Sequence, residues 1–158
     1  MAPSAALPAF TTPSATLSST RLFSSTPATF REKKDKSWVQ QGEVPYPELK
    51  SHTETPDESL LLLDVREPSE TAQGMIPSAV NVPLSEFGPA FLNKEGGGDF
   101  EKKYAFARPE FDKKIVVYCR SGKRSEQART ELEKAGWWNV RNYTGSWLDW
   151  TAQEKQRG

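Results

Sequence analysis

The sequence predicts an α/β fold in three layers, with a mostly parallel central sheet and helices on both of its faces. Two observations lead to this prediction. Short apolar runs alternate along the chain with segments of helical spacing, which is the pattern of parallel strands joined by crossover helices. The most apolar runs are continuous rather than alternating, as expected for strands that are buried on both faces of a sheet.

Four apolar runs are predicted to be strands. Residues 60–65 hold four leucines, an aspartate and a valine, and residues 115–118 combine β-branched with aromatic side chains, so both are expected to be buried strands. Residues 79–82 form a shorter run. The run at residues 138–143 alternates more, which favours a place nearer an edge. A further short strand is expected within residues 38–44.

The intervening segments are predicted to be helices, and glycine and proline mark their ends. Pro68 suits the first turn of a helix, and Gly74 is placed to end it. Ala128 and Leu132 lie on one face of a later helix, which Gly136 stops. The expected helices span residues 47–52, 67–73, 84–92, 125–135 and 146–153.

The composition fits one domain and excludes several classes of function. The chain has 158 residues, 35% of them hydrophobic, which is enough to form one hydrophobic core without the help of disulfides or metal ions. With one cysteine and one histidine it can form neither an internal disulfide nor a cysteine-based zinc site, so no metal or other cofactor is expected. The balance of 21 basic and 21 acidic residues disfavours nucleic acid as a partner. No run of about 18 apolar residues exists, so no membrane span is expected.

The first part of the chain differs from the rest in charge. Residues 1–31 contain no Asp or Glu, carry Arg21 and Arg31, and are rich in Ser, Thr, Ala and Pro. An acid-free, Ser-rich start with arginines is typical of a mitochondrial transit peptide. The alternative is a disordered tail, because four prolines discourage stable structure.

The expected domain boundary follows from this composition. We divide the chain into a transit peptide with a charged linker, residues 1–36, and a folded domain, residues 37–158. The residues around Phe23 resemble known matrix-processing sites, so cleavage is expected after Phe23 or near Phe30, and the mature protein is expected in the mitochondrial matrix.

Cys119 is the candidate catalytic residue. It follows a predicted buried strand and precedes a predicted helix, and ligands of parallel sheets bind beyond the carboxyl ends of the strands. A loop wound tightly before a helix directs backbone N–H groups inward, and the helix N-terminus adds partial positive charge. Both effects lower the pKa of a thiol. The alternative is a core cysteine, which packs as a small hydrophobe. The loop that follows is Arg120, Ser121, Gly122, Lys123 and Arg124.

Four segments together resemble the single-domain rhodaneses, the thiosulfate sulfurtransferases. Residues 119–125 resemble the active-site loop of that family, and residues 63–66 are similar to its Asp-x-Arg motif after the central strand. Residues 74–79 are similar to its Gly-His-Ile-Pro-Gly-Ala turn, with Met and Ser at the second and fifth places. Residues 142–150 resemble its C-terminal Gly and Trp signature. The resemblance implies a rhodanese-like domain of the mitochondrial type, which is a three-layer fold.

The resemblance also implies a sulfur transfer in two steps. Cys119 would be the nucleophile and persulfide carrier, taking sulfur from thiosulfate or a persulfide donor and passing it to a thiol such as glutathione or thioredoxin, or to cyanide. Loop residues 120–124 would hold the persulfide and the anionic donor. Arg120 and Lys123 are the candidates for donor binding, while Arg124 would either bind the donor or brace the loop. Asp64 and Arg66 are expected to support the loop structurally.

Three other functions remain open. Phosphatases and arsenate reductases of the same fold have a loop of Cys, five residues and Arg, whereas Ser125 stands at that spacing here and Arg124 comes one position early. A non-catalytic binding module is a second alternative, although such domains often lack the cysteine. A sulfur carrier within a larger pathway would use the same persulfide.

Overall fold

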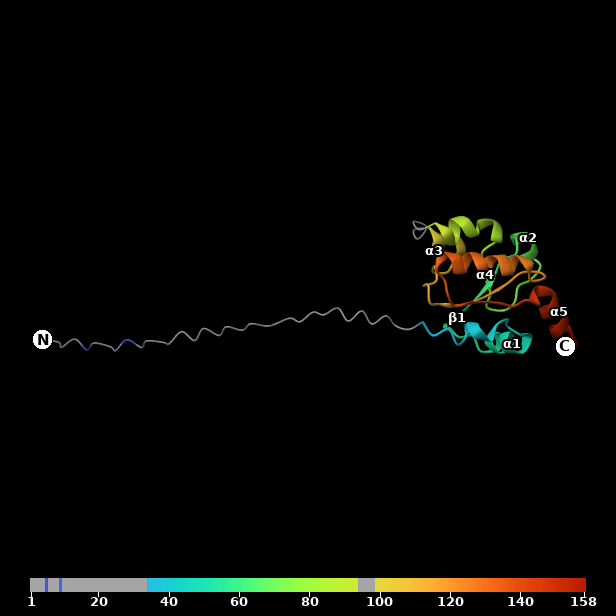
Figure 1. Ribbon diagram of the computed structural model, residues 1–158, viewed down its shortest axis with the longest axis horizontal. Helices are drawn as coiled ribbons and strands as arrows, with labels where there is room; N and C mark the ends of the chain where they lie inside the picture. The colour runs from blue at the N-terminus through green and yellow to red at the C-terminus, as the bar shows by residue number, and fades with distance from the viewer. Residues whose placement is uncertain (1–4, 6–8, 10–33, 94–98) are drawn as a thin grey trace. The chain divides into compact units, whose positions relative to one another are not determined.

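The computed structural model describes residues 34–93 and 99–158, together with Ala5 and Ala9 (Figure 1). The predicted leader therefore lies almost entirely outside the described residues, and so do both expected cleavage positions, Phe23 and Phe30.

A four-stranded parallel sheet forms the centre of the described domain. Its strands lie in the order β2-β1-β3-β4. The register pairs Asp64 of β1 with Asn81 of β2 and with Tyr118 of β3, so these three strands end at the same edge. The strands are β1 Leu60–Asp64, β2 Val80–Asn81, β3 Lys114–Tyr118 and β4 Val140–Asn142.

Helices cover both faces of this sheet, which confirms the predicted three layers. Figure 1 shows α2, α3 and α4 on one side of the strands and α1 and α5 on the other. The α-helices are α1 Tyr46–Glu54, α2 Pro68–Thr71, α3 Phe100–Tyr104, α4 Lys123–Ala135 and α5 Ser146–Arg157. Three further short helical turns are η1 Val39–Gln41, η2 Leu84–Glu86 and η3 Gly88–Leu92.

Two separate apolar cores hold the layers together, because successive side chains of a strand point to opposite faces. Val117 of β3 packs in one core with Leu132 of α4, and Cys119 belongs to this core as well. Val116 packs in the other core with Leu49 of α1 and Trp150 of α5. The continuous apolar runs of the sequence thus correspond to strands that are buried on both faces.

Two predicted elements differ from the structure. The strand expected within residues 38–44 is wrong, because the turn η1 occupies part of it. Val44 makes one strand-like hydrogen bond, from its N–H to the Asn142 carbonyl at 3.0 Å. The helix expected at residues 84–92 is continuous but not a regular α-helix: it begins as the tight turn η2, passes through helical Phe87 and widens into η3, where Pro89 lacks the N–H of a regular α-helix. The helix α3 was not predicted.

Candidate active site

Cys119 lies at the carboxyl edge of the sheet, directly after β3. Residues 120–122 form the turn that leads into α4. The cysteine is 1% exposed, so the structure combines a loop position with the burial that a core cysteine would have.

Hydrogen-bond donors surround the sulfur of Cys119. The Gly122 N–H donates to Sγ at 3.0 Å, and the Ser125 hydroxyl lies 3.5 Å from Sγ. That hydroxyl also lies 3.1 Å from the Gly122 carbonyl, so it donates to one of the two acceptors at a time.

These donors change the acidity of the thiol. Burial raises the pKa of Cys119, but hydrogen bonds from the Ser125 hydroxyl and from the N–H groups of residues 121, 122 and 125 lower it by more. The pKa is therefore below that of an ordinary thiol, whereas burial among apolar groups alone would raise it.

Gly122 allows the loop to close tightly around the sulfur. Its φ of +100° lies in the left-handed region, which side chains resist. A Cβ at this position would also lie 2.5 Å from the carbonyl oxygen of Thr144, so the loop and the chain after β4 approach too closely for any other residue.

The first turn of α5 holds the Cys119 loop through hydrogen bonds. The Ser146 hydroxyl accepts a hydrogen bond from the Cys119 N–H at 3.1 Å and donates one to the Tyr143 carbonyl at 2.8 Å. The N–H groups of Trp147 and Leu148 donate to the carbonyls of Cys119 and Arg120. The sequence motifs do not single out Ser146, although its place beside the C-terminal Gly and Trp signature is a signal that indicates it.

The basic side chains of the loop do not behave alike. Arg120 and Lys123 are exposed, as is Ser121. Arg124 is half-buried, and its Nη1 and Nη2 atoms donate to the two carboxylate oxygens of Glu70 at 2.6 and 2.7 Å. Of the two roles expected for Arg124, this geometry favours bracing over binding the donor.

Asp64 and Arg66 form a buried ion pair, with Nη2 of Arg66 2.7 Å from Oδ2 of Asp64. The same Nη2 donates to the Gly74 carbonyl at 2.7 Å, and the guanidinium lies over the ring of Trp147 at 4.6 Å. The pair therefore joins the end of β1 to the Gly74 turn and to α5. The first turn of α5 in turn binds the carbonyls of Cys119 and Arg120 through the N–H groups of Trp147 and Leu148.

Comparison with known proteins gives the family. Residues 46–153 match the family model of the Rhodanese-like domain. The chain belongs to the rhodanese family.

Named relatives agree with this assignment. A putative mitochondrial thiosulfate sulfurtransferase of Schizosaccharomyces pombe is 45% identical over 103 residues, which cover 65% of this chain and 71% of the relative. A thiosulfate:glutathione sulfurtransferase of Saccharomyces cerevisiae is 36% identical over 96 residues, covering 61% of this chain and 68% of the relative. The structure of the human single-domain sulfurtransferase TSTD1 has 32% identity and a TM-score of 0.63, over 70% of this chain and 96% of that one. This rhodanese is accordingly a sulfurtransferase.

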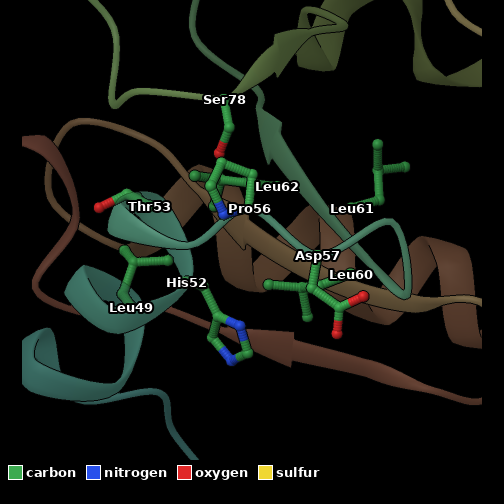
Figure 2. Close-up of a pocket in the computed structure, with 9 residues that line it drawn as sticks. All are labelled: Leu49, His52, Thr53, Pro56, Asp57, Leu60, Leu61, Leu62 and Ser78. Atoms are coloured by element: carbon green, nitrogen blue, oxygen red, sulfur yellow. The ribbon is translucent and has the colours of Figure 1, made fainter.

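A small pocket of this rhodanese lies away from Cys119. Its volume is about 60 Å³, and it lies between α1 and the start of β1, with the His52 ring at its border (Figure 2). Because β1 and β3 are parallel, the start of β1 and Cys119 lie at opposite edges of the sheet. The pocket contains no predicted site residue.

Within residues 34–93 and 99–158, no three His, Cys, Asp or Glu side chains come together in a way that could hold a metal ion. In the same part of the chain, no helix has the length and apolar character needed to cross a membrane.

Proposed function

We propose that this rhodanese transfers sulfane sulfur from thiosulfate or a related persulfide donor to a thiol, or to cyanide, through a persulfide on Cys119. One observation carries the proposal. The Sγ atom of Cys119 is buried, yet it faces the Gly122 N–H and the Ser125 hydroxyl. Such donors stabilise a single anion, and both a thiolate and a persulfide are single anions.

The proposed chemistry has two displacements on sulfur. In the first, the Cys119 thiolate attacks the outer sulfur of thiosulfate, an S–S bond forms, and the bond to the sulfonate group breaks with its electron pair leaving on sulfite. In the second, an acceptor thiolate attacks the outer sulfur of the persulfide, and the Cys119 thiolate leaves. No oxidant or reductant is consumed. With cyanide as acceptor the product is thiocyanate.

Arg120 and Lys123 are proposed to attract the donor. Both side chains are exposed at the loop, where positive charge raises the local concentration of a dianion. Arg124 is proposed as a brace, because its guanidinium is already bound to Glu70.

The names of relatives support a thiol as the sulfur acceptor and a mitochondrial localisation. Relatives in yeast and human are named thiosulfate:glutathione sulfurtransferases, which favours glutathione as the acceptor here. Thioredoxin is a second candidate acceptor. Two relatives, from fission and budding yeast, are named mitochondrial. Together with the acid-free leader, these names support import into mitochondria, and we propose the matrix as the destination.

The site disfavours the phosphatase alternative. A phosphatase loop presents an arginine to the phosphate six positions after the cysteine, but Ser125 occupies that position and directs its hydroxyl toward Sγ. The neighbouring Arg124 is bound to Glu70. The lowered pKa of Cys119 also disfavours a non-catalytic binding module.

The full chain given thiosulfate and cyanide is expected to form thiocyanate, and Cys119→Ser is expected to reduce the rate to background because an alcohol is a far weaker nucleophile. Thiosulfate alone should add the mass of one sulfur atom, which a reducing thiol removes. Circular dichroism checks that the variant is folded. Unchanged turnover in Cys119→Ser would contradict the proposal, and hydrolysis of an aryl phosphate by an otherwise inert protein would favour the phosphatase.

A further inference from the structure

The ion pair of Glu70 and Arg124 joins two elements at the active site. Glu70 belongs to the short helix α2, and Arg124 is the second residue of α4. Two hydrogen bonds of 2.6 and 2.7 Å connect the carboxylate to both terminal nitrogens of the guanidinium. This is the bidentate geometry by which arginine binds carboxylates and, equally well, sulfate or phosphate.

Arg124 lies close enough to the reactive sulfur to matter electrostatically. Its neighbour Ser125 places its hydroxyl 3.5 Å from Sγ of Cys119. The pKa of Arg124 is raised, first by its hydrogen bonds to Glu70 and to a lesser degree by the charge of the Cys119 thiolate. A guanidinium in this place would bind a tetrahedral oxyanion at the loop if its two donors were free.

We propose that Glu70 is a specificity-determining residue, which occupies the donors of Arg124 and thereby keeps the loop from binding tetrahedral oxyanions tightly. The inference rests on the proposed function, in which the loop must hold one sulfane sulfur and then release sulfite. Arg124 then stabilises the sulfur anion through its charge alone, and the exposed Arg120 and Lys123 attract the donor.

The pair persists under working conditions. The hydrogen bonds from Arg124 outweigh the effect of burial and lower the pKa of Glu70 to about 2. A carboxylate whose pKa is depressed in this way keeps its charge, and its contribution to the pair, throughout the neutral range and loses it only in strong acid. The selectivity against oxyanions is thus a fixed property of the site and not a pH switch.

Sulfate binding by the full, reduced chain tests this role. Sulfate is titrated at constant ionic strength while the backbone amide NMR signals of Ser121 and Gly122 are followed. In Glu70→Gln the freed guanidinium is expected to tighten sulfate binding about fivefold, the effect of one partly solvated charge-assisted pair. The double variant Glu70→Gln with Arg124→Gln is expected to lose that gain.

A matched control separates this effect from the loss of any negative charge. Glu133→Gln removes a carboxylate that pairs with Arg129 further along the same helix, about 15 Å from its start by the rise per residue. It is expected to bind sulfate as the wild type does. Unchanged or weaker binding in Glu70→Gln would overturn the proposal. An equal gain in Glu133→Gln, or a gain that survives in the double variant, would overturn it as well.

The measurement does not depend on turnover. If the wild type failed to form thiocyanate, the proposed function would fall, while the ratio of sulfate affinities would still report on Glu70 and Arg124. Should Glu70→Gln not fold, Glu70→Asp keeps the charge but shortens its reach by one methylene. That variant is expected to show a smaller gain in sulfate affinity, and no gain would count against the proposal.

Discussion

Individual residues decide whether the buried sulfur is inert or reactive. A cysteine that packs in an apolar core has a raised pKa and little reactivity. Cys119 packs in such a core, next to α4, but its Sγ also faces a backbone N–H and the Ser125 hydroxyl. Because these donors outweigh the effect of burial, the pKa of the thiol is lowered.

Ser125→Ala is expected to raise the pKa of Cys119. Burial would remain, but the hydroxyl that stabilises the thiolate would be gone. The thiolate fraction at neutral pH should therefore fall, and alkylation by iodoacetamide should slow roughly threefold to tenfold, as for the loss of one long hydrogen bond to a charged group. The rate is measured against pH, and its rising limb should shift to higher pH.

Thr130→Ala provides the control for this change. Its hydroxyl is on the same helix but bonds to the Glu126 carbonyl. The variant is expected to follow the wild-type pH profile. Superimposable profiles for Ser125→Ala and the wild type would mean that the backbone N–H groups alone determine the acidity of the thiol.

At the scale of elements, the first turn of α5 links two parts of the site. Its backbone N–H groups bind the carbonyls of the Cys119 loop, while the Trp147 ring lies against the guanidinium of Arg66. Arg66 in turn is held by Asp64 at the end of β1. We propose that the Asp64–Arg66 pair supports the geometry of the Cys119 loop through this series of contacts, from β1 through Arg66 and α5.

Arg66→Met is expected to destabilise the fold strongly. It would leave the fully buried Asp64 carboxylate without its charged partner, which typically costs about 3–5 kcal/mol. Arg129→Met is the matched control, because Arg129 pairs with Glu126 and Glu133 on the solvent side of α4, where an exposed pair contributes about 1 kcal/mol or less. Urea unfolding gives both free energies. Similar losses in the two variants would show that the buried pair has no special role.

At the scale of the whole molecule, the chain is proposed to consist of a leader with linker, residues 1–36, and a folded domain, residues 37–158. The contacts near this boundary begin a few residues earlier, because the Lys34 ammonium lies over the Trp138 ring at 5.6 Å. The Arg141 guanidinium lies over the Trp38 ring at 4.9 Å, and the Val44 N–H donates to the Asn142 carbonyl, so the segment from Trp38 to Val44 is attached to β4.

Residues 1–36 are expected to carry a fused reporter into mitochondria. The prediction rests on the absence of acidic residues from positions 1–31 and on the two arginines there. Replacing Arg21 and Arg31 by Glu should leave the reporter in the cytosol, and N-terminal sequencing of the imported protein should locate the cut after Phe23 or near Phe30. Import that is indifferent to the arginines would contradict a transit peptide.

Local sequence patterns are sufficient to predict the layered sheet and the position of the thiol. A strand that is buried on both faces needs a nearly continuous apolar run, so the strands within residues 60–65 and 115–118 can be recognised from the local sequence. Cys119 was predictable for a similar reason, since it stands between such a strand and a helix.

The side chains that complete the site are brought together by long-range contacts of the fold. Glu70 and Arg124 are 54 residues apart, and Ser146 reaches the Cys119 N–H from 27 residues away. Such partners meet because crossover helices bring separate strand ends to one edge of the sheet, and the spacing within any short segment does not encode that meeting. The sequence places three basic residues in the loop after the thiol. In the fold, Arg124 is paired with the Glu70 carboxylate, while Arg120 and Lys123 remain exposed at the surface.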